Sequence, residues 1–330
     1  MRLMQIQNKR TRFVAVRDEE GQLRLLHTVG TVYDLAVMAA NKKASLREII
    51  ADHIGAAVDE NRLLAEARIL PPITHPDAAR LMVSGTGLTH ISSAQARDHM
   101  HLTATVTDDK PTDSMRMFQW GVAGGKPADG VFFGAQPEWF YKGDGNSVVP
   151  PGADIIRPAF AKDGGEEPEI AGVYIINHEG LPCRIGFALG NEFSDHVMEK
   201  QNYLWLAHSK LRQCALAPEL MIGELAPEIH GVSAIRRHGK TIWQKDFFSG
   251  EAHMCHSIAN IQRHHFKYLS FCRPGDVHVH FFGTATLSYA DHMQVEDGDE
   301  FVIHCDDFGM PLLNRLRLEK TARQTEVMVL

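Results

Sequence analysis

Short apolar runs separated by turn residues dominate the chain from about residue 81 onward. Runs rich in β-branched and aromatic residues predict strands at 81–84, 130–133, 170–176, 184–189, 277–282 and 300–305. One longer amphipathic stretch, 194–212, interrupts them and predicts a helix. Many short strands with few helices indicate a predominantly β domain, built as a sandwich or a rolled barrel.

The N-terminal part of the chain has a different pattern and predicts a small α/β module. Two apolar runs, 13–16 and 23–26, flank a polar segment and predict a hairpin. Ser45 and Glu48 have the spacing of a capping box, which predicts that a helix begins there. Helix and hairpin together are expected to form a unit with its own apolar face.

Prolines and glycines mark the limits of these elements. A second helix is expected at 61–69, and three prolines between residues 71 and 76 end the helical pattern. We therefore expect a small N-terminal α/β domain at 1–75 and a larger catalytic domain at 76–330. The segment 107–130, rich in Asp, Gly and Pro, is expected to form a long ordered loop or lid.

Composition excludes several classes of protein. The chain has 330 residues, of which 44% are hydrophobic and 23% charged, and a formal net charge of -7. These values are typical of a globular protein, and they provide no basic field for nucleic acid. No apolar run approaches the roughly 18 residues of a membrane span. Five scattered cysteines without a C-x-x-C pair indicate a reducing, cytoplasmic location.

Histidine is abundant, with 19 residues in the chain. His278 and His280 share one face of an expected strand, as ligands of zinc sometimes do. No third ligand stands at a useful spacing. We therefore favour the interpretation that both are structural residues of a strand whose ring nitrogens are satisfied by the backbone.

Two glutamates stand at the start of a strongly apolar strand. Residues two apart share a face of a strand, so Glu167 and Glu169 are expected to point the same way. A turn at 178–181 would fold the chain back, pairing Ile175 with Arg184 and bringing Glu192 opposite Glu167. The two carboxylates would then lie roughly 5 Å apart.

Three converging carboxylates, with no obvious cation among them, would repel one another. A hard divalent cation resolves the repulsion, and ligation by oxygen alone favours Mg²⁺, Mn²⁺ or Ca²⁺ over zinc. The alternative is a solvated acidic edge, with Glu192 near the start of the following helix, where the helix dipole favours its charge.

Several segments resemble the motifs of the fumarylacetoacetate hydrolase superfamily, in the same order and at matching spacing. They are 137–142, 167–171, 190–194, 274–277, 283–284, 298–299 and 309–314. The resemblance covers about residues 80–318. It implies an α+β fold, with a predominantly β rolled sandwich behind a small N-terminal α/β domain, commonly as a homodimer. It also implies that Glu167, Glu169 and Glu192 bind Mg²⁺, with Mn²⁺ possible, and that Glu192 replaces the usual aspartate.

Such a site suits a small 2-keto acid as substrate. Three carboxylates leave roughly three positions of a magnesium octahedron open. A 2-keto acid can chelate the ion, which then stabilises the enolate formed when a C3 proton is lost. Hydrolases of the superfamily carry N-Y-x-x-H-x-x-E. Here His90 is present, but Ser93 stands at the position of the glutamate, so a water-activating His–Glu pair is in doubt.

The segment 209–218 resembles instead the sugar-acid branch of the superfamily, which includes 2-keto-3-deoxy-pentonate dehydratases. The activity this implies is Mg²⁺-dependent dehydration of a 2-keto-3-deoxy-pentonate of L-arabonate type, giving 2-oxoglutarate semialdehyde. One alternative is hydrolysis of a C–C bond in a 2,4-diketo sugar acid. Others are a non-catalytic sugar-acid-binding homologue and a tautomerase or decarboxylase of oxaloacetate.

Individual roles follow from the same resemblance. Lys210 can accept the C3 proton if metal charge and partial burial lower its pKa. Its alternative role is that of an ordinary surface lysine at a helix C-terminus. His90 is expected to protonate the leaving hydroxyl or to orient the substrate chain. Lys142 is expected to hold the substrate carboxylate or to form a salt bridge. The remaining substrate contacts are expected from Gly283, Thr284 and Ser194.

Overall fold

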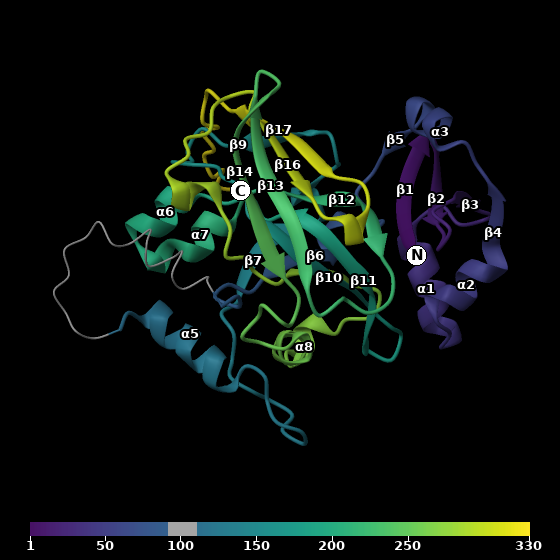
Figure 1. Ribbon diagram of the computed structural model, residues 1–330, viewed down its shortest axis with the longest axis horizontal. Coiled ribbons are helices and arrows are strands. Elements are labelled where there is room, and N and C mark those ends of the chain that lie inside the picture. The colour runs from purple at the N-terminus through teal and green to yellow at the C-terminus, as the bar shows by residue number, and fades with distance from the viewer. Residues whose placement is uncertain (92–110) are drawn as a thin grey trace.

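The computed structural model describes residues 1–91 and 111–330, and two β-sheets make up most of this part (Figure 1). In sheet order, the larger contains β4 (Ile54–Ala57), β3 (Leu23–Leu26), β2 (Thr11–Arg17), β1 (Arg2–Asn8), β12 (Cys214–Met221), β11 (Pro182–Asn191), β10 (Pro168–Ile176), β15 (Val277–Phe281), β6 (Leu81–Gly85) and β7 (Phe140–Asp144). Two short strands lie off this path, β5 (Arg68–Ile69) beside β1 and β8 (Val148–Val149) beside β12. The smaller sheet contains β14 (Lys240–Ser249), β13 (Ile229–Arg237), β16 (Glu300–His304), β17 (Leu312–Leu318) and β9 (Asp154–Arg157).

Two hydrophobic cores lie on opposite faces of the larger sheet. One contains side chains of β10, β11 and β12 together with side chains of β13, β16 and β17, so the two sheets pack as a sandwich. The other lies between the larger sheet and the helices α1 (Val32–Lys42) and α2 (Leu46–His53). Strand β10 is buried along its whole length. Burial on both faces explains its continuous apolar sequence.

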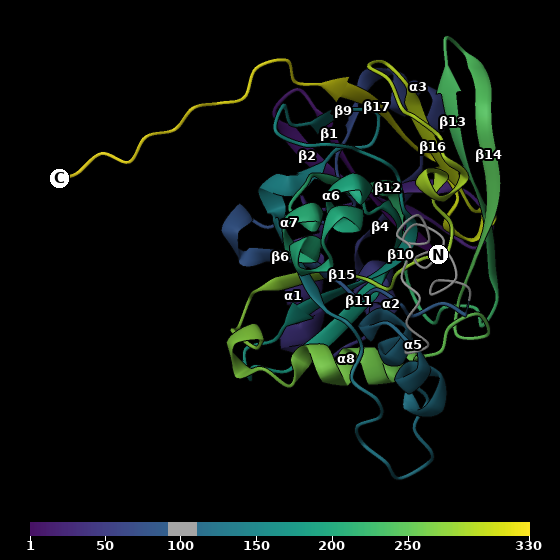
Figure 2. The same ribbon diagram turned by 90° about the vertical axis from the view of Figure 1, so that its left-hand side faces the viewer.

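The other helices lie around the sandwich. They are α3 (Glu60–Glu66), α5 (Asp113–Gly124), α6 (His196–Gln201), α7 (Leu206–Lys210) and α8 (Ile258–Phe266). In Figure 1, α5 and the loop after it project from the body. The residues that follow β17 extend away from it in Figure 2. The architecture is α+β and mostly sheet, as the sequence predicted.

Most of the predicted elements are present. The hairpin of β2 and β3 forms, and Ser45 and Glu48 make both hydrogen bonds of the capping box at α2. The predicted strands are present except for 130–133. That segment forms no strand because Gly130 has a φ of +83° and Phe132, 62% exposed, has no strand beside it among the described residues.

Three other predictions need correction. The expected helix 194–212 is two short helices, because Asn202 is extended and its side chain accepts a hydrogen bond from the backbone N–H of Leu204. The helix expected at 61–69 ends at Glu66, and the next residues pair with β1 instead. The predicted loop 107–130 contains α5, and its first four residues lie outside the described part.

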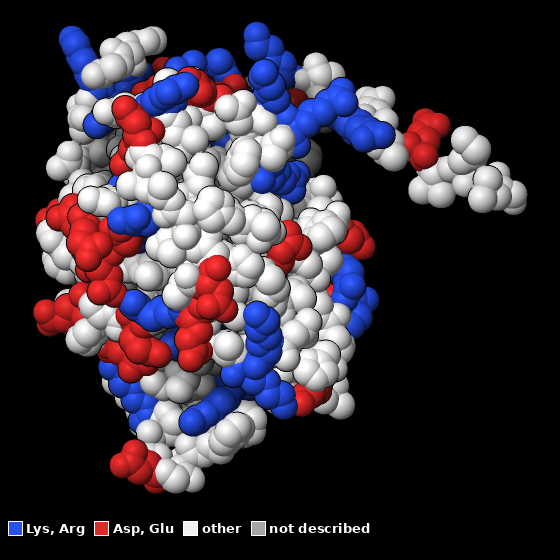
Figure 3. Space-filling view, turned by 90° about the vertical axis from the view of Figure 1, so that its right-hand side faces the viewer, with Lys and Arg blue, Asp and Glu red and all other residues white. Residues whose placement is uncertain are grey.

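The N-terminal module shares a sheet with the rest of the chain. Strand β1 pairs with β12, with Leu3 opposite Leu220. The division at residue 75 stays a prediction. Acidic and basic side chains are interspersed on the face shown in Figure 3, without a continuous basic surface. None of the helices described combines the length and the apolar character that crossing a bilayer requires.

Candidate metal centre

Strands β10 and β11 bring the predicted carboxylates together. Glu169 pairs with Gly190, and the backbone N–H of Glu192 donates to the carbonyl of Glu167 at 3.0 Å. The predicted pairing is therefore confirmed at this end of the hairpin. The register shifts between Val173 and Tyr174. Between this shift and the turn, the prediction is wrong by one residue, because Ile175 pairs with Cys183 and not with Arg184.

The three glutamates form a compact group of oxygen ligands. Glu167, Glu169 and Glu192 are buried, and one oxygen of each lies within 4.8 Å of the others. With a Mg–O distance of about 2.1 Å, adjacent oxygens of a Mg²⁺ octahedron lie about 3 Å apart and opposite ones about 4 Å. The cluster can therefore hold a divalent metal ion after a small contraction.

Lys210 lies among these carboxylates. Its Nζ donates to Glu167 Oε1 and to Glu192 Oε2, both at 2.6 Å, and to Ser194 Oγ at 3.0 Å. Both the expectation that no cation is close and the surface-lysine interpretation are wrong, because Lys210 is buried at the end of α7. Burial disfavours the ammonium ion, but the charges of Glu167 and Glu192 outweigh burial and raise the pKa of Lys210 above its usual range. The lowering expected from the sequence requires the charge of a bound metal ion in addition to burial.

Lys142 forms the salt bridge that the sequence left open as an alternative. Its Nζ lies 2.5 Å from Glu192 Oε1, and both side chains are fully buried. It also donates to the carbonyl oxygens of Phe193 at 2.7 Å and Lys210 at 3.1 Å. Lys142 therefore holds both Glu192 and the end of α7 in place.

The negative charge of Glu169 is compensated by fewer groups than the charges of Glu167 and Glu192. Its Oε2 accepts the backbone N–H of Gly283 at 2.7 Å, and within the described residues it forms no ion pair. Burial, followed by the charges of Glu192 and Glu167, raises the pKa of Glu169 well above its usual range. A buried carboxylate facing two others without a cation of its own fits a metal ligand.

His196 was not predicted and anchors Glu167 from the other side. Its Nε2 lies 3.0 Å from Glu167 Oε1 and its Nδ1 lies 3.5 Å from Asp163 Oδ2. Its ring stacks on Tyr289 at 5.2 Å. Burial opposes its protonation, but Asp163 and Glu167 outweigh burial and raise the pKa of His196 to about 10. The only signal in the sequence was its place four residues after Glu192.

A fourth glutamate, Glu166, was also missed. Its carboxylate accepts from the backbone N–H of Ser288 at 2.9 Å and from Ser288 Oγ at 2.7 Å. Burial raises the pKa of Glu166 to about 7. Its side chain thus ties the start of β10 to the 288–291 turn, and it is absent from the group of metal-ligating oxygens.

His90 lies beside Gly283 in a polar cluster of its own. Its Nδ1 is 3.0 Å from Thr89 Oγ1 and its Nε2 is 3.1 Å from Ser249 Oγ. Burial lowers the pKa of His90 to about 3, so the ring is neutral at pH 7 and is no imidazolium acid. The position of Ser93 lies outside the described residues.

Gly283 and Thr284 form the turn that faces Glu169. Gly283 has a φ of +88°, and a Cβ placed there would lie 2.5 Å from Thr89 Oγ1 and 2.7 Å from Thr86 O. Only glycine fits this close approach. Thr284 Oγ1 accepts the backbone N–H of Thr286 at 3.1 Å, which orders the turn.

The histidines of β15 form a buried cluster with α8. His278 Nδ1 lies 3.0 Å from His265 Nε2, and His280 Nδ1 lies 2.8 Å from Ser84 Oγ. Within the described part of the chain, the three glutamates are the only group with metal-ligand spacing. The two strand histidines are therefore structural, as expected, although these two contacts are with side chains and not with the backbone.

Comparison with models of known protein families and with curated sequences gives no match. Solved structures do match. A 2-keto-3-deoxy-D-arabinonate dehydratase in its apo form superposes with a TM-score of 0.71 at 18% identity, covering 97% of this chain and 100% of that chain. The same kind of enzyme complexed with magnesium and 2,5-dioxopentanoate gives 0.70 at 18% identity, with the same coverage. A 5-carboxymethyl-2-hydroxymuconate delta-isomerase from Mycobacterium smegmatis gives 0.56 at 17% identity, covering 97% and 99%.

These similarities establish the fold. The chain has the fold of solved structures of dehydratases and isomerases, and its α+β class is the one expected from the sequence. Among them, the 2-keto-3-deoxy-D-arabinonate dehydratases are more similar in structure to this chain than the delta-isomerase.

Proposed function

We propose that the protein is a Mg²⁺-dependent dehydratase of a 2-keto-3-deoxy-pentonate of the L-arabonate type, giving 2-oxoglutarate semialdehyde. The observation that carries the proposal is the buried group of Glu167, Glu169 and Glu192 around Lys210. Support comes from the similar fold of a dehydratase whose structure contains magnesium and 2,5-dioxopentanoate, which is the same five-carbon keto aldehyde.

Each of the three carboxylates is held by different groups of the protein. His196 and Lys210 hold Glu167, while Lys142 and Lys210 hold Glu192. The backbone of Gly283 holds Glu169. A bound Mg²⁺ would supply the positive charge that stabilises the anion formed at the keto oxygen when the C3 proton leaves. Fixed ligands reduce the reorganisation that this charge requires.

Lys210 is the proposed acceptor of the C3 proton. Its contacts with Glu167 and Glu192 favour the protonated form. Neutralisation of these carboxylates by a divalent cation removes the attraction that raises its pKa, while burial continues to disfavour the charged form. Loss of the C3 proton and the C4 hydroxyl removes one water, and rearrangement of the unsaturated keto acid gives the aldehyde at C5.

The other proposed substrate contacts lie near the cluster. Ser194 Oγ donates to Glu192 and accepts from Lys210, while Thr284 lies in the turn facing Glu169. His90, neutral in this setting, is proposed to orient the substrate chain as a hydrogen-bonding group.

Substrate turnover tests the proposal directly. The protein is incubated with 2-keto-3-deoxy-L-arabonate and, separately, its D-isomer, with Mg²⁺ and without divalent cations. The expected result is Mg²⁺-dependent formation of one keto aldehyde per substrate consumed. Formation of pyruvate and a second acid would overturn the dehydratase in favour of C–C cleavage. Binding of substrate without any product would overturn it in favour of a non-catalytic binding protein.

We also propose a homodimer in a reducing cytoplasm. The five cysteines are free, and three of them are buried. Light scattering of the purified protein measures the assembly, and a monomeric mass at micromolar concentration would contradict the dimer.

A further inference from the structure

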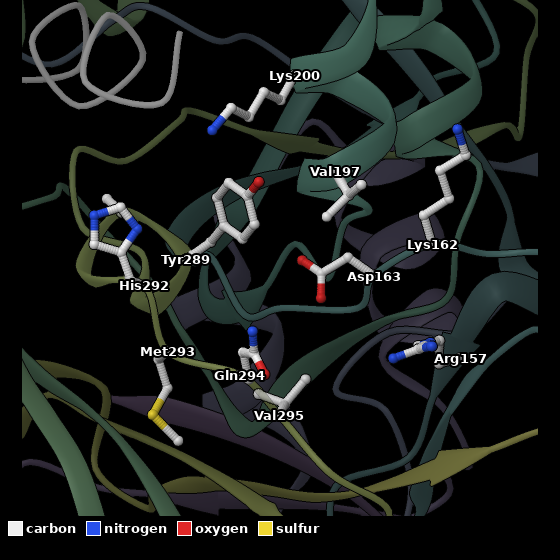
Figure 4. A pocket seen from close by; sticks show the side chains of 11 residues that line it. Arg157, Lys162, Asp163, Val197, Lys200, Tyr289, His292, Met293, Gln294 and Val295 are labelled. Atoms are coloured by element: carbon white, nitrogen blue, oxygen red, sulfur yellow. The ribbon is translucent and has the colours of Figure 1, made fainter. Parts of the chain in front are cut away.

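A cavity lies next to helix α6, beside the metal centre. Its volume is about 410 Å³, and its walls come from residues 157–163, from α6 and from residues 289–295 (Figure 4). The three clustered glutamates do not belong to its described lining. The cavity is therefore a separate site, with a size typical of pockets that bind small molecules.

Two cations of the cavity wall form no direct contact with an acidic side chain in the part of the chain that the structure describes. Arg157, at the end of β9, and Lys200, in α6, form no side-chain hydrogen bond or ion pair with any other described residue. A third cation, Lys162, is directed away and donates to Gln201 Oε1 (Figure 4). The charge of Arg157 also acts on the carboxylate of Asp163, so the wall carries these two cations against one carboxylate. Excess positive charge in a concave site attracts anions.

The polar lining also includes a carboxylate, a phenol, an imidazole and a carboxamide, from Asp163, Tyr289, His292 and Gln294. Asp163 lies in the middle of the cavity in Figure 4, with Tyr289 beside it. Asp163 is 16% exposed, and its one ion pair within the described residues is the 3.5 Å contact with His196. The Tyr289 hydroxyl forms no hydrogen bond with residues 1–91 or 111–330. The cavity thus offers an acceptor and a donor as well as positive charge.

This combination selects a particular ligand chemistry. A compact inorganic anion would be attracted by Arg157 and Lys200 but repelled by Asp163. A ligand with a carboxylate at one end and hydroxyls along its chain meets both requirements, because a hydroxyl can donate to Asp163. The apolar side chains of Val197 and Val295 suit the C–H face of such a chain.

We propose that this cavity binds a hydroxylated carboxylate of five carbons, a pentonic acid, at a site distinct from the metal centre. The choice of five carbons rests on the proposed function, whereas the hydroxy-acid chemistry rests on the cavity. The binding is independent of divalent cations, because no residue of the carboxylate cluster takes part.

Calorimetry of the full chain, freed of divalent cations on a chelating resin, tests this site. The probes are D- and L-arabinonate, with arabinitol as the uncharged analogue and sulfate as the anion without a hydroxyl chain. We expect one arabinonate per chain, bound at least about tenfold more tightly than arabinitol or sulfate. Arg157→Gln and Lys200→Gln, singly and together, are each expected to weaken binding by about tenfold or more. Lys240→Gln, an exposed lysine of β14 outside the cavity, is expected to leave it unchanged.

Several outcomes would overturn the proposal. They are absence of arabinonate binding, unchanged binding in both single variants, and sulfate binding as tight as that of arabinonate. Glu169→Gln separates this site from the proposed function. Arabinonate binding in that variant, with turnover lost, supports both proposals. Metal-dependent turnover in the native protein without metal-free binding of arabinonate refutes the cavity alone.

Discussion

Replacing Gly283 by alanine tests whether this turn positions Glu169. An L-residue at a φ of +88° is strained by about 1–2 kcal/mol. The new Cβ would also lie 2.7 Å from the backbone oxygen of Thr86 and 2.5 Å from Thr89 Oγ1, so the turn must move. Overpacking of this kind costs about 1–3 kcal/mol, which gives a total loss in the free energy of unfolding of about 2–5 kcal/mol.

Gly298→Ala is the matched control. Gly298 has a φ of +90°, and a Cβ there meets nothing within 4 Å, so only the loss of about 1–2 kcal/mol from backbone strain is expected. Urea unfolding followed by circular dichroism measures both variants. Calorimetric titration with Mg²⁺ gives the second measurement, because movement of Gly283 removes the N–H that holds Glu169. Equal stability losses in the two variants, with Mg²⁺ binding intact, would refute the reasoning.

Three further predictions concern the carboxylates, the lysine and the buried histidines. Glu169→Gln is expected to reduce Mg²⁺-dependent turnover at least about 100-fold with an unchanged circular dichroism spectrum, and full activity would exclude the site. Lys210→Ala is expected to lower kcat by about 10²–10⁴-fold, and by more than it raises KM; an unchanged kcat in steady-state assays would remove it from the mechanism. Burial lowers the pKa of His278 to about 4 and of His280 to about 3, from 6.5. Both rings are neutral in the folded protein, whereas in the unfolded chain they take up protons below pH 6.5. The free energy of unfolding is therefore full above pH 6.5 and falls as the pH falls, by up to about 1.4 kcal/mol per pH unit for each histidine. Urea unfolding between pH 7 and pH 5 measures this loss, and a flat profile would contradict it.

The carboxylate cluster could be predicted because it depends on local rules. Side-chain alternation along one strand places Glu167 beside Glu169, and a single hairpin brings Glu192 across from them. A bulge could have reversed the faces. The shift lies between Val173 and Tyr174, closer to the turn, so the strand ends that carry the glutamates keep the predicted register.

The groups that hold the carboxylates could not be predicted in the same way. Lys142 reaches Glu192 from β7, and Asp163 reaches His196 from the loop after β9. These contacts depend on how distant strands are ordered in the sheets, which no local pattern of the sequence encodes. The same limit explains why the ion pairs of Lys210 with Glu167 and Glu192 were not predicted.

The balance of charge at the centre connects the fold to its proposed chemistry. Three buried carboxylates face two buried ammonium groups, Lys142 and Lys210, while His196 is balanced by Asp163. One negative charge therefore remains, and burial makes it costly unless a proton or a further cation arrives. The raised pKa of Glu169 favours uptake of a proton, and a divalent cation would compensate the same charge in its place. Because a divalent cation brings one charge more than is missing, its arrival also favours loss of a proton from Lys210. The charge that stabilises the ligand set would thus produce the base that the proposed reaction needs.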